Sequence, residues 1–259
     1  MKHILVASDL SERSDHAIRR AVRVAEQHGA TLTLAFIVDS ALPADIAANV
    51  QKQARITLQT KLDHCVPDPA LRTDIQVPVG DVALEVGHVA QVTEADLLVV
   101  GVHRRRLFFD QVKETTMERL IRYSRLPVLT VVLPAEAPYA HLLGGIDLSR
   151  ACASALRLAR EMAPGADLSL FHAHEVSFRK EAERDYATWL AVSGMPTDLP
   201  APIYVEAKPT DAVDQITKES DIDLLAIGAH SRSNIGRFVL GTFSSDMIRN
   251  PPCDILVGK

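Results

Sequence analysis

The sequence contains few cysteines and no long apolar segment. Its three cysteines, Cys65, Cys152 and Cys253, are far apart, odd in number and without C-x-x-C spacing, which argues against a disulfide framework and favours a reducing compartment. The first apolar run, at residues 4–7, is too short for a signal peptide, and no run approaches the length that crosses a membrane. We therefore expect a cytoplasmic protein without a membrane partner.

The sequence also lacks an excess of positive charge. Its formal net charge is -5, and the basic triplet at residues 104–106 has no interleaved aromatic residues, so it is interpreted as a solvated loop and no nucleic-acid partner is expected. No P-loop with a Gly-Lys-Ser/Thr ending is present, and no serine stands in a context that identifies its base. No catalytic residues are therefore assigned.

Four segments of the first half recur in the same order in the second half. HILVASDLS (3–11) returns as HLLGGIDLS (141–149), and ATLTLAFIVDS (30–40) returns as ADLSLFHAHE (166–175). ADLLVVGVH (95–103) recurs as IDLLAIGAH (222–230), and LPVLTVV (126–132) matches CDILVGK (253–259). The order of the matches indicates a duplicated chain, and the Pro- and Ala-rich stretch at 133–140 marks the boundary between the halves.

Each half alternates short, nearly continuous apolar strands with helical patterns, which is typical of a parallel sheet covered on both faces. The fold class is therefore α/β, with two tandem doubly wound domains at residues 1–136 and 137–259, each a five-stranded parallel sheet flanked by helices. We expect the two domains to pack on each other as a pseudo-dimer. Further helices are predicted at residues 44–63 and 177–193.

Four polar residues are predicted to begin helices as N-caps. Ser11 and Ser149 follow the first strand of each half, and Asp81 and Asp211 precede the third helical pattern.

The loop after the fourth strand of the second half, residues 228–242, is rich in glycine and serine and precedes a plausible helix. Free backbone N–H groups and the positive end of a helix dipole bind anions, and ligands of open α/β sheets bind beyond the carboxyl ends of the strands. The loop is therefore a candidate anion site, although an ordinary flexible connection would have the same composition.

These features together resemble the universal stress protein family, in its tandem form, over essentially the whole sequence. The resemblance rests on Asp9 and Asp147 after the first strands, on the second strand LTLAFIVD and on the closing CDILV. Nucleotide-binding members carry a loop of the form G-x2-G-x9-G-[ST]. The second half matches it from Gly228 to Gly241, with Ser231 in place of the second glycine. The implied fold is the universal stress protein-like, adenine nucleotide alpha hydrolase-like one.

The resemblance implies an adenine nucleotide (ATP, ADP or AMP), alone or with Mg²⁺, in the second half. Asp147 would accept a hydrogen bond from the adenine or ribose edge, and the backbone of Ala173 would contact the base. The remaining implied site residues would surround the ribose and phosphates: Gly228, His230, Ser231, Gly241, Thr242 and Phe243. Ser231 keeps the backbone N–H donor of the glycine that it replaces, but it adds a Cβ. The alternative is therefore a degenerate loop that packs against the protein and binds no nucleotide.

The first half departs further from the family pattern. Arg104 and Glu114 occupy the positions of Ser231 and Gly241, and a carboxylate there would repel phosphate. The apolar residues 107–109 are expected to pack on the other domain or on a neighbouring chain.

His172 and His174 are interpreted as strand-end histidines rather than as a zinc site. The leading functional hypothesis is a stress-response protein that acts through nucleotide-linked conformational or assembly changes. The alternatives are a scaffold without nucleotide that binds a protein partner or forms a homodimer, and, ranked lower, a slow ATPase.

Overall fold

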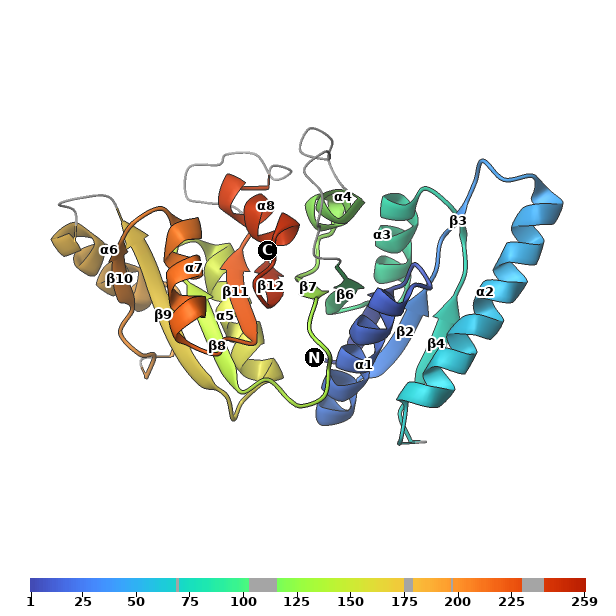
Figure 1. Cartoon of the computed structure of the whole chain (residues 1–259), viewed down its shortest axis with the longest axis horizontal. Helices are drawn as coiled ribbons and strands as arrows, with labels where there is room; N and C mark the ends of the chain where they lie inside the picture. The colour runs from blue at the N-terminus through green and yellow to red at the C-terminus, as the bar shows by residue number, and fades with distance from the viewer. Residues whose placement is uncertain (69, 103–115, 175–178, 197, 230–239) are drawn as a thin grey trace. The chain divides into compact units, whose positions relative to one another are not determined.

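The computed structural model describes the chain except for residues 69, 103–115, 175–178, 197 and 230–239. The chain divides into two compact units, Met1–Glu136 (unit 1) and Ala137–Lys259 (unit 2). Each unit holds a parallel sheet with helices on both faces (Figure 1), which confirms the predicted α/β class. The expected pseudo-dimer packing of the two units stays a prediction.

Unit 1 alternates strands and helices along the chain. Its elements are β1 (His3–Ala7), α1 (Glu12–His28), β2 (Thr31–Ala35), β3 (Val38–Asp39), α2 (Ala44–Cys65), β4 (Thr73–Gln76), β5 (Val79–Gly80), α3 (Val82–Val92), β6 (Leu97–Gly101), α4 (Thr116–Tyr123) and β7 (Val128–Val131). The strands pair in parallel in the order β7-β6-β1-β2-β4, and β3 and β5 form a separate parallel pair.

Unit 2 repeats this pattern with β8 to β12. Its elements are β8 (His141–Gly145), α5 (Arg150–Met162), β9 (Asp167–His174), α6 (Arg179–Val192), β10 (Ile203–Glu206), α7 (Pro209–Glu219), β11 (Leu224–Gly228), α8 (Thr242–Arg249) and β12 (Asp254–Gly258). Its strands pair in parallel in the order β12-β11-β8-β9-β10, so the strand order of unit 1 recurs.

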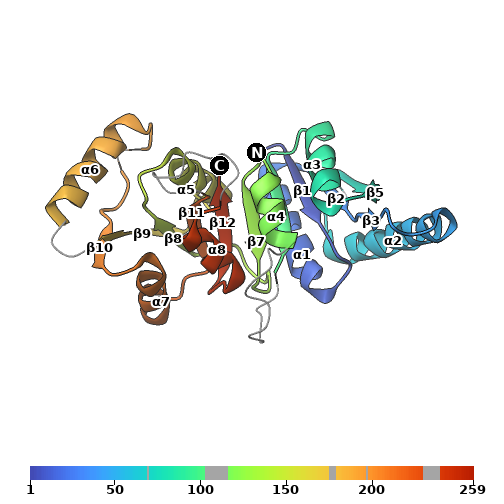
Figure 2. The ribbon, with the colours of Figure 1, turned by 90° about the horizontal axis from the view of Figure 1, so that it is seen from above.

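The helices of each unit lie in two layers. In unit 1, α1 and α2 cover one face of the sheet and α3 and α4 the other, and in unit 2 the pairs α5 with α6 and α7 with α8 divide in the same way (Figure 2). The central strands are buried along their length; Ile4, Leu5 and Val6 of β1 are all 0% exposed. The strand order places the switch point of each sheet between two neighbouring strands, β1 and β6 in unit 1 and β8 and β11 in unit 2.

The helix starts test the predicted N-caps. The Ser149 hydroxyl accepts the Cys152 N–H at 3.0 Å, and the Asp81 carboxylate accepts the N–H groups of Ala83 and Leu84, so both are caps as predicted. Ser11 occupies the N-cap position of α1, but its hydroxyl makes no capping bond.

The prediction for Asp211 was wrong. Lys208 is the N-cap of α7 and Pro209 lies at its start, which places Asp211 inside the first turn. Proline is favoured there because its fixed φ suits a helix and its missing N–H would have no partner at that position. Within the described residues, no helix is long and apolar enough to cross a membrane.

A leucine in the left-handed region follows the strand-one aspartate in both units. Leu10 has φ 64° and Leu148 has φ 63°, although a Cβ in this region costs roughly 1–2 kcal/mol. Each leucine turns the chain sharply from the first strand toward the first helix. The turn holds Asp9 and Asp147 at the rim of the sheet, beyond the carboxyl ends of the strands.

Candidate functional site

A hollow of about 160 Å³ lies at the carboxyl ends of β8, β9 and β11 in unit 2, at the switch point of the sheet. Its walls include Asp147, Phe171, Ala173, Ile227, Gly228 and Phe243. Most of these side chains are apolar, and Asp147 contributes a carboxylate. The hollow therefore combines an apolar lining with one strong hydrogen-bond acceptor, an arrangement that suits small organic ligands.

Backbone geometry holds the Asp147 carboxylate in place. The Ser149 N–H donates to Oδ1 of Asp147 at 2.8 Å, across the turn that Leu148 makes. The Ser149 hydroxyl in turn caps α5. Asp147 is thus oriented by the start of α5, and its side chain is half-buried at the mouth of the hollow.

Gly228 ends β11 directly beside this carboxylate. A Cβ on Gly228 would lie 3.1 Å from Oδ2 of Asp147 and 3.0 Å from both the Cys152 nitrogen and the Ser149 hydroxyl oxygen. These distances are tighter than ordinary van der Waals contacts, so only glycine fits without a shift of the neighbours. The absence of a side chain lets the end of β11 approach the start of α5 closely.

The apolar wall is built from three neighbouring strands of unit 2, β8, β9 and β11. A Cβ on Gly145 would lie 3.2 Å from the Phe171 ring and 3.3 Å from Ile227, so these two side chains close over the glycine backbone. His172 Nδ1 donates to the Ile146 carbonyl at 2.7 Å, which fixes the imidazole of His172 against β8. The three strands thus present a closely packed apolar wall to the hollow.

The start of α8 forms the other side of the site. Gly241 is the N-cap of α8 without a side-chain capping bond, and its own N–H donates to the Ala229 carbonyl at 3.0 Å. The Ser244 hydroxyl donates to the Gly228 carbonyl at 2.8 Å and so fastens α8 to the end of β11. The N–H groups of Thr242 and Phe243 have no acceptor among the residues that the structure describes, as is usual in a first helical turn.

The structure thus brings together four of the residues expected at the nucleotide site: Asp147, Ala173, Gly228 and Phe243 line one hollow. Gly241 and Thr242 lie at the adjoining start of α8, where the Gly241 amide is already paired. His230 and Ser231 lie outside the described residues.

Sequence reasoning missed three residues of the wall, Gly145, Phe171 and Ile227, which line the hollow from within strands. It also missed the left-handed Leu148. The tripeptide Asp-Leu-Ser recurs in both halves, which could have indicated a shared turn at Leu148. Leucine, however, is not a residue type that indicates a positive φ.

Asp9 holds the corresponding position in unit 1 and has more polar neighbours of its own. The Asp9 carboxylate accepts hydrogen bonds from the hydroxyls of Ser11 and Ser14 and lies 3.8 Å from the Arg13 guanidinium. Partial burial opposes ionisation of Asp9, but the two hydroxyls, the Ser11 amide and Arg13 together lower its pKa below the usual value. These hydrogen bonds all end on Oδ1 of Asp9, whereas Oδ2 lies 3.8 Å from Arg13.

Two further polar groups near the hollow have structural partners. The Cys152 thiol lies 3.2 Å from the Gly145 carbonyl, and burial raises the pKa of Cys152 to about 12, so it is not a nucleophile at neutral pH. Among the described residues, no group of three or more His, Cys, Asp or Glu side chains is placed to hold a metal ion. Glu175, next to the His172–His174 pair, lies outside those residues.

The fold and the strand-end hollow define a tandem, doubly wound α/β protein, and comparison with known proteins specifies its class. The sequence model of the Universal stress protein family matches residues 1–132 and 200–259, so the chain belongs to this family. Universal stress protein A homolog 1 of Coxiella burnetii (strain RSA 493 / Nine Mile phase I) is 33% identical over 113 residues, which cover 39% of this chain and 76% of that protein.

Solved structures show the same fold over the whole chain. A universal stress protein from Archaeoglobus fulgidus DSM 4304 superposes with a TM-score of 0.77 at 18% identity, covering 99% of this chain and 98% of that one. A putative universal stress protein from Pseudomonas aeruginosa UCBPP-PA14 gives a TM-score of 0.67 at 17% identity, covering 100% and 93%. At these identities the likeness concerns the fold, and the ligand must be argued from the site.

Proposed function

We propose that unit 2 binds an adenine nucleotide (ATP, ADP or AMP), with the base in the hollow and the phosphates at the start of α8. In this proposal the protein acts in a stress response by coupling nucleotide occupancy to a change of conformation or assembly. The observation that carries the proposal is the convergence of Asp147, Gly228 and Phe243 on one hollow at the switch point of the sheet.

The size and lining of the hollow favour a base rather than a whole nucleotide. Its volume of about 160 Å³ is below the roughly 300–1,000 Å³ of pockets that enclose complete ligands. A planar base would lie between the Phe171 and Ile227 wall and the side chain of Phe243, and its amino group or the ribose hydroxyls would donate to Asp147. The sugar and phosphates would then extend out of the hollow.

The first turn of α8 supplies the groups that a phosphate needs. The N–H groups of Thr242 and Phe243 are unpaired with any described residue, and they stand at the positive end of the helix dipole. The Gly241 amide contributes nothing further while it donates to Ala229. Any Mg²⁺ that binds would be held through the phosphates, since the described residues offer no cluster of ligands for a metal.

Unit 1 is proposed not to bind nucleotide in the same way. Oδ1 of Asp9 already accepts hydrogen bonds from the hydroxyls of Ser11 and Ser14, and Arg13 lies 3.8 Å from Oδ2, so a base edge would compete with these groups. The sequence places Glu114 where unit 2 has Gly241, and this carboxylate would repel phosphate. One nucleotide per chain is therefore expected.

The test is calorimetric titration of ATP, ADP and AMP into the wild-type chain and into the Gly241→Glu variant, which copies the residue of the first half. We expect a stoichiometry of one and at least a tenfold weaker affinity in the variant, because a carboxylate would stand at the start of α8. The Glu114→Gly variant is the matched control and should keep wild-type affinity. Equal affinity in wild type and Gly241→Glu would place the nucleotide elsewhere.

A scaffold function without nucleotide is distinguished by what the protein carries after purification. The ratio of absorbance at 260 and 280 nm, followed by chromatography of the denatured supernatant, reports any retained nucleotide and its identity. Retained adenine nucleotide that disappears in the Gly241→Glu variant supports the proposal. Absence of binding by all three nucleotides in calorimetry would favour the scaffold.

A further inference from the structure

A second and larger hollow lies in unit 1, on the face of the sheet that α3 and α4 cover. It is a groove of about 700 Å³ between these two helices, with Leu98 of β6 at its floor. This volume lies within the roughly 300–1,000 Å³ of pockets that take small organic ligands. All of its lining residues belong to unit 1, so the groove is formed by that unit alone.

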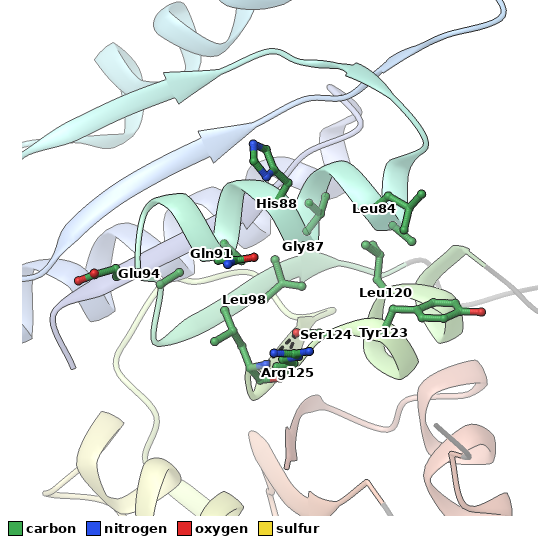
Figure 3. Close-up of a pocket in the computed structure, with 15 residues that line it drawn as sticks. Leu84, Gly87, His88, Gln91, Glu94, Leu98, Leu120, Tyr123, Ser124 and Arg125 are labelled. Atoms are coloured by element: carbon green, nitrogen blue, oxygen red, sulfur yellow. Dashed lines mark hydrogen bonds between the residues drawn. The ribbon is translucent and has the colours of Figure 1, made fainter. Parts of the chain in front are cut away.

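The groove is apolar at one end and polar at the other. Figure 3 shows Leu84 of α3 beside Leu120 and Tyr123 of α4 at the apolar end. Gln91 and Glu94 lie toward the opposite end. Leu84 is 68% exposed and Tyr123 is 49% exposed, so apolar surface is open to solvent at the first end. A ligand that covered these two side chains would gain the hydrophobic free energy of that surface.

Gly87 leaves the middle of the groove without a side chain. Glycine is the poorest helix former after proline, and a Cβ on Gly87 would have no heavy atom within 4 Å. Neither close packing nor a positive φ therefore requires glycine at this position, which lines the groove. The missing side chain keeps the space between the two helices open.

Arg125 places a positive charge between the two ends of the groove (Figure 3). It follows α4 in a tight turn, in which the Ser124 hydroxyl accepts the Leu126 N–H at 3.0 Å. Among the described residues, no acidic side chain forms an ion pair with Arg125. Since a guanidinium binds a carboxylate through two parallel hydrogen bonds, the groove offers a cation to the headgroup of an anionic ligand.

The second copy of the fold lacks these features. The repeats ADLLVVGVH and LPVLTVV align with IDLLAIGAH and CDILVGK, and the same alignment matches three groove residues, Leu84, Gly87 and Arg125, with Asp211, Asp214 and Pro252. The fold itself therefore does not need an apolar rim, a glycine or an arginine at these positions. Their presence together in unit 1 indicates a binding surface.

We propose that the α3–α4 groove of unit 1 binds an amphiphilic monocarboxylate of the medium-chain fatty acid class. The carboxylate pairs with Arg125, and the alkyl chain extends over Gly87 toward Leu84. Glu94 lies at the end opposite to Leu84 and sets this direction, because it would repel a carboxylate bound beside it. The same repulsion disfavours a doubly charged headgroup such as a phosphate. The proposal does not depend on nucleotide binding in unit 2.

The first test is calorimetric titration of hexanoate, octanoate and decanoate, each below its critical micelle concentration, into the full chain. We expect the affinity to rise about two- to fourfold per added methylene group, since each buried group contributes transfer free energy. 1-Octanol lacks the charge and should bind at least about tenfold more weakly than octanoate. No binding of octanoate, an affinity independent of chain length, or tighter binding of octyltrimethylammonium or 1-octanol than of octanoate would overturn the proposal.

The second test compares two groove variants with two controls outside the groove. Arg125→Gln removes the charge, and Gly87→Asp places a carboxylate in the groove, as unit 2 has at the matching position. We expect octanoate affinity to fall at least about tenfold in each groove variant. Arg19→Gln and Gly165→Asp make the same changes elsewhere and should bind like the wild type.

Both groove variants should fold. Arg125 is exposed, aspartate is a better helix former than glycine, and a side chain on Gly87 enters open space. Circular dichroism during thermal unfolding checks the fold of each variant before titration. Wild-type octanoate affinity in either groove variant would overturn the proposal, because the carboxylate would then bind without Arg125 or away from the middle of the groove.

Discussion

The end of β11 lies so close to the carboxylate that follows β8 that a Cβ on Gly228 would stand 3.1 Å from Oδ2 of Asp147. The two residues lie at the ends of the two strands of the switch point in unit 2, and both line the hollow. The site therefore depends on the absence of one side chain.

Replacing Gly228 by alanine should disturb both the site and the fold. The added methyl group must displace Asp147, Ser149 or the start of α5, which typically costs about 1–3 kcal/mol of stability in a well-packed region. We expect nucleotide affinity to fall about tenfold or more, as measured by calorimetry. Gly165→Ala is the matched control, because a Cβ there meets no atom within 4 Å, and it should leave affinity unchanged.

Removing the hydroxyl of Ser149 should destabilise unit 2 through its helix cap. The Ser149→Ala variant loses the acceptor for the Cys152 N–H, which typically lowers the free energy of unfolding by about 1 kcal/mol. Urea unfolding followed by circular dichroism measures the change. Thr188→Ala removes a hydroxyl that bonds only within α6, so it should cost less, and an equal loss in both variants would argue against the cap.

Acid stability should depend on Asp9. Its pKa in the folded chain lies below the ordinary value of 3.8: burial acts to raise the pKa, and the hydroxyls of Ser11 and Ser14, the Ser11 amide and Arg13 together lower it by more. The stabilisation is therefore complete above pH 3.8 and is lost as the pH falls through the folded pKa.

We expect Asp9→Asn to reduce the steepness with which unfolding free energy falls below about pH 4 in urea titrations. Asp81 also has a lowered pKa, chiefly because the Leu84 N–H donates to it, so some pH dependence should remain. If the variant and the wild type lost stability in parallel, Asp9 would have no part in acid unfolding.

The three cysteines should differ in reactivity. Cys152 and Cys253 are 0% and 1% exposed, and burial raises the pKa of Cys152 to about 12, whereas Cys65 at the end of α2 is half-buried. A chromogenic disulfide reagent should therefore modify one thiol quickly in the native protein and all three after unfolding. The Cys65→Ser variant should lose the fast phase, and its persistence would mean that a buried thiol becomes accessible.

The architecture could be predicted from the sequence because the same strand and helix patterns occur in both halves, and their agreement indicates each element twice. It also placed Asp147, Ala173 and Gly228 correctly at strand ends, since parallel strands bring their carboxyl ends to one edge. Phe171 and Ile227 were missed because a strand residue that lines a hollow has the same apolar pattern as one in the core.

Other features depend on local geometry that residue types do not reveal. Leu148 adopts a positive φ that leucine seldom takes, and Pro209 starts α7 before Asp211. Gly87 is an ordinary helical glycine in the sequence, and only the structure shows that its missing side chain faces open space.

The central claim, that unit 2 alone binds an adenine nucleotide, is tested most directly by amide NMR of the ¹⁵N-labelled chain during titration with ATP. The account predicts shifts of the Thr242, Phe243, Ala173 and Gly228 amides that saturate together at one equivalent, with the amides of Leu10 and Gly101 in unit 1 unchanged. Perturbations confined to unit 1, or none at saturating ATP, would contradict it.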